Sequence, residues 1–164
     1  MIAFLAITRE PATFTAAAAL VPVTNLFQRL AWKGEARQRQ RIDPQNRMGG
    51  PPAEQREMYR DRSPLFQVDK LRTPLLVHVA NNDADVNIEE GMQLVDALRS
   101  RKAELAETKV YENPKGGHMF DRQVDAKTGQ PENTREQRDS WNRVWTFFEW
   151  HLDPFHATPN LAVP

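Results

Sequence analysis

Residues 73–86 read T-P-L-L-V-H-V-A-N-N-D-A-D-V, and the fold prediction depends on this segment. An apolar run from Leu75 to Ala80 follows a proline and ends at asparagines and aspartates. Such a run without alternation is typical of a strand that is buried on both faces, as in a parallel sheet. We therefore predict a central strand over 75–80, with a polar loop over 81–86 at its carboxyl end.

Two further strands are predicted on either side of this segment. Residues 14–23 form a second apolar run, and residues 108–112 form a third, shorter one. Before the third strand, Asn87 and Glu90 have the spacing of a capping box, which predicts the start of a helix. The apolar stripe of that helix comprises Ile88, Met92, Val95 and Leu94 or Leu98. Strands that alternate with helices indicate an α/β fold, with three parallel strands flanked by helices.

More helices are expected toward both ends of the chain. Residues 1–7 are apolar and lack the basic segment of a secretion signal, so they predict a buried helix. Residues 26–32 predict a short helix. Thr134 and Gln137 form another capping-box pattern before the last helix. The apolar stripe of this helix comprises Trp141, Val144, Trp145, Phe148 and Leu152, and we expect Trp141 and Trp145 to be core residues.

The remaining segments are polar. Residues 33–64 contain several glycines and prolines, and they predict a loop with one short helix over 53–60. The basic residues of 37–41 are interpreted as a solvated loop face. Residues 1–153 are expected to form one partial domain, and residues 154–164 an extended tail.

Composition excludes several classes of function. The 164 residues include 22 basic and 22 acidic residues, so no net charge favours a nucleic acid or an anionic membrane as partner. The chain has no cysteine, which excludes disulfides, thiolate metal ligands and a cysteine nucleophile. No His/Asp/Glu set has a familiar metal-ligand spacing, and we expect neither a metal nor a cofactor. Nothing in the sequence predicts a compartment.

Two polar loops follow neighbouring strands and predict a site. Asp83 lies in the loop after the central strand, and Gly116-Gly117-His118 follows the third strand. Because the carboxyl ends of parallel strands meet at one edge of a sheet, we expect Asp83 and His118 to lie close together. A carboxylate that accepts a hydrogen bond from an imidazole fixes its tautomer, as acyl-transfer chemistry requires.

Plainer interpretations stay open for each of these residues. A histidine in a loop is usually only a solvated polar residue, and an aspartate before a helix is often only a turn residue. Asp85, which lies two residues before Asn87, is the expected turn residue here. His78 is interpreted as a core histidine whose hydrogen bonds are satisfied, and no partner is predicted for His151 or His156.

Residues 13–152 resemble the C-terminal half of the catalytic domain of the prolyl oligopeptidase family, which has the α/β-hydrolase fold. Residues 78–86 are similar to the family motif H-G-x-x-D-x-x-V, with one residue more before the aspartate, which falls on Asp83. Gly117-His118 is similar to the G-H motif that carries the catalytic histidine. Other similar segments are Ala19–Asn25, Tyr59–Leu65 and Lys70–Leu76. The resemblance implies that Asp83 orients the imidazole and that His118 acts as general base.

The chain departs from the family pattern in three places. Val79 stands where glycine is usual, and Asn87 stands where proline is frequent. The third departure is that G-x-S-x-G occurs nowhere, and none of the three serines lies at a predicted strand-to-helix turn. Since the family's nucleophile lies a few residues before the segment matched by residues 1–6, we expect the chain to begin just after it. The sheet is then incomplete.

The resemblance implies a serine-type peptidase that hydrolyses a peptide substrate, of which this chain retains the aspartate and histidine but lacks the serine. We expect the chain alone to be inactive. An esterase or other acyl hydrolase of the same fold is the nearest alternative. A non-catalytic remnant with a structural or binding role is the other. We predict no nucleic acid or membrane partner. We do predict that the chain can associate with itself through an unpaired sheet edge.

Overall fold

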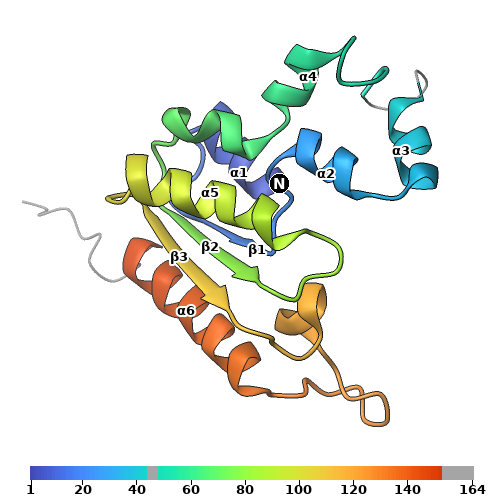
Figure 1. The fold of residues 1–164 in the computed structure, drawn as a ribbon. Coiled ribbons are helices and arrows are strands. Elements are labelled where there is room, and N and C mark those ends of the chain that lie inside the picture. Colours follow the sequence, from blue (N-terminus) through green and yellow to red (C-terminus); the bar gives the residue numbers. More distant parts are fainter. Residues whose placement is uncertain (44–47, 153–164) are drawn as a thin grey trace, which may run out of the picture.

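The structure, a computed structural model, describes residues 1–43 and 48–152, except the side chains of Arg37 and Arg41. The predicted tail over 154–164 lies outside the described residues. Strands and helices alternate along much of the chain (Figure 1), in the order α1 (Ile2–Arg9), β1 (Ala17–Leu20), α2 (Leu26–Trp32), α3 (Glu35–Ile42), α4 (Arg56–Asp61), the 3-10 helix η1 (Pro64–Lys70), β2 (Leu75–Ala80), α5 (Ile88–Arg101), β3 (Ala106–Tyr111), the 3-10 helix η2 (Gly117–Arg122) and α6 (Arg135–Leu152).

The three strands form one parallel sheet in the order β1-β2-β3, which confirms the predicted fold class. The central strand has the predicted bounds, but β1 covers only Ala17–Leu20 of the predicted residues 14–23. It ends where Val21 takes a positive φ of 42° and a proline follows, because that backbone conformation cannot continue a strand. The third strand begins at Ala106, before the predicted Thr108.

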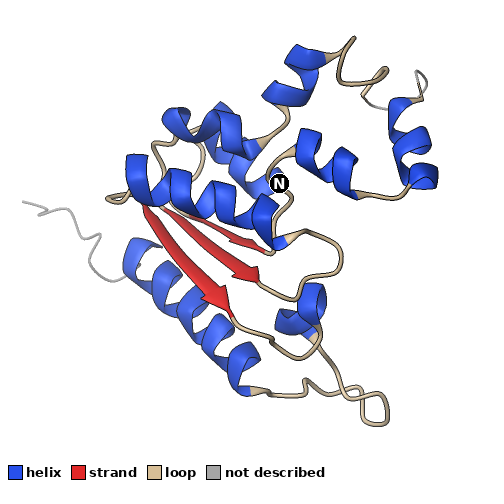
Figure 2. Ribbon diagram, in the orientation of Figure 1, coloured by secondary structure: helices blue, strands red, loops and turns tan. Residues whose placement is uncertain are grey.

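Helices cover both faces of the sheet (Figure 2). Leu75, Val77 and Val79 of β2 point to one face, where they share a core with α1, η1 and α5. Leu76 points to the other face and packs against Val144 and Phe147 of α6. The central strand is buried along its whole length for this reason, as its unbroken apolar run predicts.

The prediction for the last helix was right about its start and wrong about its packing face. Thr134 accepts a hydrogen bond from the amide of Gln137 at 3.1 Å, as the capping-box pattern predicts. The residues that α6 buries are Gln137, Ser140, Val144 and Phe147. Trp141 is 40% exposed and Trp145 is 67% exposed, so neither is a core residue. Within the described part of the chain, α6 alone packs on this face of the sheet, and its far side is exposed.

Part of the predicted loop over 33–64 is helical. The basic segment lies in α3, where Arg39 pairs with Glu35 one turn earlier at 3.1 Å. The predicted helix over 53–60 is displaced to Arg56–Asp61. None of the helices in the described ranges combines the length and the apolar character needed to cross a bilayer.

Candidate active site

The loops after β2 and β3 are joined to each other at the carboxyl edge of the sheet. The amide of Asn113 donates to Oδ1 of Asn81 at 2.6 Å, and Nδ2 of Asn82 donates to the carbonyl of Pro114 at 3.0 Å. The sequence prediction did not assign these asparagines a role. Their position directly after a buried strand was the available signal, because loops there converge on a common edge.

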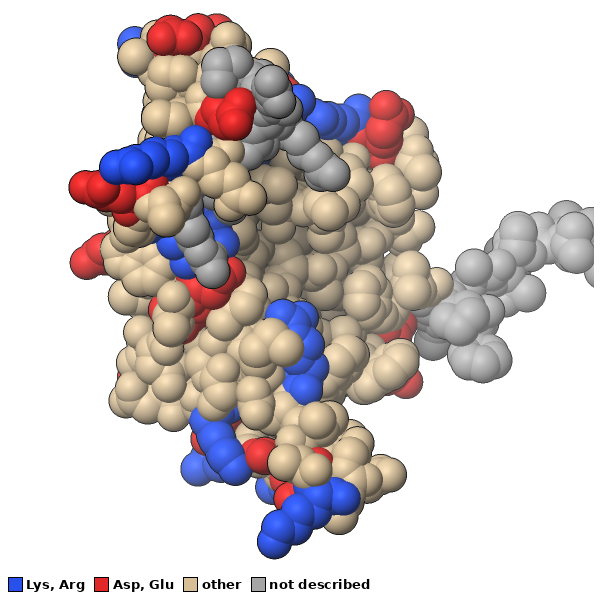
Figure 3. Space-filling view, turned by 90° about the vertical axis from the view of Figure 1, so that its right-hand side faces the viewer, with Lys and Arg blue, Asp and Glu red and all other residues tan. Residues whose placement is uncertain are grey.

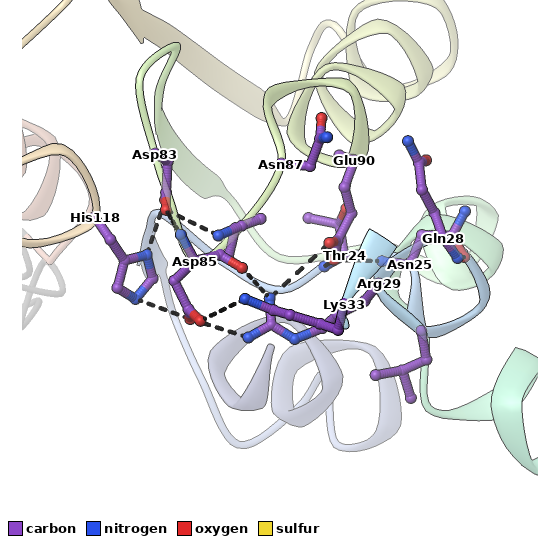
Figure 4. Close-up of polar contacts among 12 residues, drawn as sticks. Thr24, Asn25, Gln28, Arg29, Lys33, Asp83, Asp85, Asn87, Glu90 and His118 are labelled. Carbon is purple, nitrogen blue, oxygen red and sulfur yellow. Dashed lines mark hydrogen bonds and ion pairs between the residues drawn. The ribbon is translucent and has the colours of Figure 1, made fainter. Parts of the chain in front are cut away.

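Asp83 and His118 meet at this edge, as predicted. Nδ1 of His118 lies 2.8 Å from Oδ2 of Asp83, whose side chain is only 2% exposed (Figure 4). The other carboxylate oxygen accepts from the amides of Asp85 and Val86 at 2.7 and 2.8 Å. Asp83, and not Asp85, is therefore the residue whose side chain makes the turn. These two backbone hydrogen bonds hold the carboxylate of Asp83 in the position in which it contacts the imidazole.

Two glycines allow the histidine loop to come this close. Gly116 has a φ of 94° and Gly117 a φ of 51°, which are conformations that favour glycine. A Cβ on Gly117 would lie 2.9 Å from the carbonyl oxygen of Asn82. Any larger residue at 117 would push the two loops apart. The imidazole of His118 is 26% exposed, so it is anchored by Asp83 and still reaches solvent.

A second carboxylate stands on the other side of the imidazole. Oδ2 of Asp85 lies 3.7 Å from Nε2 of His118. The same oxygen accepts from Nη2 of Arg29 at 2.9 Å, and Oδ1 accepts from Nζ of Lys33 at 2.9 Å (Figure 4). Burial alone would raise the pKa of Asp85, but the hydrogen bonds from Lys33 and Arg29 outweigh it and hold that pKa well below its usual range.

Sequence reasoning missed the two cations of this cluster. Arg29 lies on α2 and Lys33, one turn later, is the C-cap residue of that helix; both are buried. Two basic residues with this spacing on a helix that follows an apolar strand were a signal for a buried carboxylate partner, because buried charges are generally paired.

Glu90 has a different role from the predicted one. Asn87 caps α5 by accepting from the amide of Glu89 at 2.8 Å. The carboxylate of Glu90 instead accepts from the amides of Thr24 and Asn25, at 2.8 and 3.1 Å. Its side chain is fully buried, and burial raises its pKa despite the amides and the nearby cations. The capping-box spacing therefore predicted the helix start correctly and the glutamate's partner wrongly.

His78 is buried in the sheet, and only one of its two ring nitrogens makes a hydrogen bond within the described residues. Its Nδ1 lies 2.9 Å from Oγ of Ser140, whereas its Nε2 has no hydrogen-bond partner among the described residues. Burial lowers the pKa of His78 to about 4. The three serines make their hydrogen bonds elsewhere: Ser140 with His78, Ser63 with the carbonyl of Tyr59, and Ser100 with the carbonyl of Ala97.

The arrangement supports proton transfer at one imidazole nitrogen. Asp83 occupies Nδ1, which leaves Nε2 as the nitrogen available to a reacting group. The face toward which the strands' carboxyl ends point is hollowed in the middle and mostly uncharged there, with charged side chains around it (Figure 3). Within 1–43 and 48–152, no group of three or more acidic or histidine side chains could hold a metal ion.

Comparisons with known proteins bear on the family and the fold of the chain. A sequence model described as the prolyl oligopeptidase family matches residues 1–154. Among curated proteins, none matches the chain. The uncomplexed acylaminoacyl peptidase of Pyrococcus horikoshii is similar in structure, with a TM-score of 0.66, 19% identity, and coverage of 94% of this chain and 23% of that one.

Two other solved structures show the same fold. An acylaminoacyl peptidase in complex with Z-Gly-Gly-Phe-chloromethyl ketone has a TM-score of 0.63 and 19% identity over 88% of this chain and 21% of that one. A puromycin-hydrolyzing peptidase of Mycobacterium tuberculosis has a TM-score of 0.54 and 21% identity over 67% of this chain and 16% of that one. The chain spans about a fifth of the length of these acylaminoacyl peptidases.

Proposed function

Because the chain belongs to the prolyl oligopeptidase family, we propose that Asp83 and His118 are two members of a serine-peptidase triad. The observation that carries this proposal is the 2.8 Å contact between Oδ2 of Asp83 and Nδ1 of His118. It is supported by the two backbone amides that fix Asp83 and by the partial exposure of the imidazole. The reaction is peptide-bond hydrolysis through an acyl-enzyme.

His118 acts as the general base in this proposal. Its Nε2 takes the proton of the attacking serine hydroxyl and later gives it to the leaving amine. Asp83 accepts from Nδ1–H, which keeps the imidazole in the required tautomer and stabilises the imidazolium. In this proposal the nucleophile is none of the three serines of this sequence, since each bonds to another group and none bonds to His118 in the described structure. It belongs to a segment outside these 164 residues.

Activity-based labelling tests the proposal. We expect the 164-residue chain to remain unlabelled by a fluorophosphonate and to hydrolyse no acyl-peptide p-nitroanilide, because loss of the nucleophile costs about as much as loss of the whole triad. The same chain extended by the coding sequence upstream of Met1 should be labelled at one serine and should hydrolyse the substrate.

Variants of the extended protein assign the roles. His118→Ala should abolish labelling, and Asp83→Asn should lower kcat by about 10⁴-fold. Asn retains an acceptor for the amides of Asp85 and Val86, so the loop should stay folded. Labelling of Ser63, Ser100 or Ser140 in the 164-residue chain would refute the proposal.

The alternatives predict different results in the same assays. An esterase of this fold would hydrolyse p-nitrophenyl esters but not the matched anilide, and its labelling would still depend on His118. A non-catalytic remnant would show neither labelling nor hydrolysis in the extended form. We place the peptidase first because the family model covers nearly the whole chain.

A further inference from the structure

The surroundings of Nε2 on His118 contain an arrangement that the proposed triad does not use. Asp85 places a carboxylate oxygen 3.7 Å from that nitrogen, which is longer than a hydrogen bond but close enough for a strong electrostatic interaction. The carboxylates on the two sides of the ring therefore differ. Asp83 accepts a hydrogen bond from the ring, whereas Asp85 stands near it without one.

Two cations account for the place of Asp85. Arg29 binds both the carboxylate and the backbone carbonyl of Asp85, each at 2.9 Å, and Lys33 binds the second carboxylate oxygen at 2.9 Å. Arg29 and Lys33 are almost completely buried, while the side chain of Asp85 is 36% exposed. The cations thus pull Asp85 from the protein side and restrain it from moving onto the imidazole.

Glu90 supports these cations from α5. It accepts from the first amides before α2, and its second oxygen lies 4.0 Å from Nη1 of Arg29. Glu90 therefore holds the amino end of α2, the helix that carries Arg29 and is followed by its C-cap residue Lys33. A continuous set of contacts runs from α5 through α2 to the ring of His118 (Figure 4).

We propose that Asp85 is a positioning residue for His118. Arg29 of α2 and Lys33, the C-cap residue of that helix, hold its carboxylate beside Nε2, where it faces the positive charge that the ring gains during the reaction without taking a hydrogen bond from it. The inference rests on the proposed role of His118 as general base: that role requires Nε2 to be free before the reaction and the imidazolium to be stabilised during it. If Asp85 were not restrained, its carboxylate could accept a hydrogen bond from Nε2–H of the imidazolium and hold that nitrogen protonated, so that it could not act as base.

The reaction of His118 with diethyl pyrocarbonate measures this directly, because the reagent acylates an unprotonated imidazole nitrogen. The 164-residue chain is treated at pH 6, below the usual histidine pKa of about 6.5, and modification is quantified by mass spectrometry of the peptide that contains His118. His151, on α6, serves as the reference within the same molecule. Asp85→Asn removes the charge beside Nε2, and the rate at His118 should rise at least about threefold relative to His151.

Lys33→Met provides the decisive comparison. It releases Asp85 on one side, so the carboxylate should approach Nε2 and the rate at His118 should fall at least about threefold. In the double variant, adding Lys33→Met to Asp85→Asn should not change the rate at His118 further, because Lys33 acts on the ring through the carboxylate of Asp85. A merely structural role of Lys33 would give additive effects instead.

Matched controls come from the opposite end of the sheet. Asp69 pairs with Arg101 at 2.9 Å just before β2, and Lys70 follows it in an exposed position. Asp69→Asn and Lys70→Met make the same charge changes and should leave the ratio of His118 to His151 unchanged. Equal rates at His118 in the wild type, Asp85→Asn and Lys33→Met would overturn the inference. The triad proposal is tested separately by fluorophosphonate labelling, so the failure of one is distinguishable from the failure of the other.

Discussion

At the scale of single residues, surroundings give the same side chain different properties. Asp83 and Asp85 are two residues apart, yet one is fixed by backbone amides and the other by two cations. His118 and His78 differ in the same way. The first lies in a loop at the site, and the second is fully buried between β2 and α6, with Ser140 as its partner.

The burial of His78 predicts a pH dependence of stability. Its pKa is lowered to about 4, whereas an unfolded histidine has a pKa of about 6.5. Between these values the unfolded state binds a proton that the folded state does not. The free energy of unfolding should therefore be highest above pH 6.5 and fall as the pH drops toward 4, with His78 contributing up to about 3 kcal/mol of the loss.

His78→Asn removes this titration and keeps a side chain that can bond to Ser140. Urea unfolding at pH 7 and pH 5, followed by tryptophan fluorescence, should show a smaller loss of stability in the variant than in the wild type. Equal losses in the two proteins would mean that His78 is not kept neutral by the fold.

At the scale of elements, the contacts across the sheet decide which side of each helix is buried. The departure at Val79 is accommodated by α5, because Gly91 packs on it and a Cβ at 91 would lie 3.1 Å from Cγ1 of Val79. On the opposite face, α6 turns Ser140, Val144 and Phe147 toward β2 and leaves Trp145 in solvent. The apolar stripe that was predicted for α6 lies partly on its outer side.

A pair of substitutions on α6 tests this orientation. Phe147 is 3% exposed and packs with Leu76 and Val144, so Phe147→Ala should lower the free energy of unfolding by about 3–5 kcal/mol. Trp145→Ala removes a larger side chain that is 67% exposed, and it should cost less than about 1 kcal/mol. Urea unfolding measures both. If Trp145→Ala lowered the free energy of unfolding more than Phe147→Ala, Trp145 would be a core residue after all.

At the scale of the whole molecule, the two edges of the sheet are unequal. β3 carries Glu107 and Lys109, and charges on an edge strand oppose pairing with another chain. β1 consists of three alanines and a leucine, and no strand of the described residues pairs with its outer edge. Ile2 and Phe14 add exposed apolar surface at the start of the chain. An uncharged, unpaired edge is a template for association.

We therefore predict that the 164-residue chain self-associates through β1. Ala17 and Val21 donate their amides to the β2 side, so Ala18, between them, points its amide outward. Ala18→Pro removes one outward donor and leaves the bonds to β2 in place, since proline is tolerated on an edge strand. Sedimentation velocity at micromolar concentration should show oligomers of the wild type and a shift toward monomer in the variant. A monodisperse wild-type monomer would contradict the prediction and favour a self-sufficient remnant.

The sequence by itself determined the α/β class, the parallel sheet and the approach of Asp83 to His118. These features depend on local signals: an unbroken apolar run identifies a strand buried on both faces, and polar residues after such strands share the sheet's carboxyl edge. The asparagine cap of α5 and the threonine cap of α6 are equally local, and both are confirmed.

Only the tertiary structure decided which partners the remaining polar groups take. Glu90 has the spacing of a capping residue, but it bonds to amides that precede α2, 65 and 66 residues away in sequence. Asp85 reaches two cations more than 50 residues away. Trp145 faces solvent because, among the described residues, α6 is the only helix packed on that face of the sheet. Local sequence patterns determine which polar groups need a hydrogen-bond or ion-pair partner and which apolar side chains need to be buried. Which group satisfies that need depends on how the elements pack, because a buried charge takes whichever partner the packed elements bring within reach.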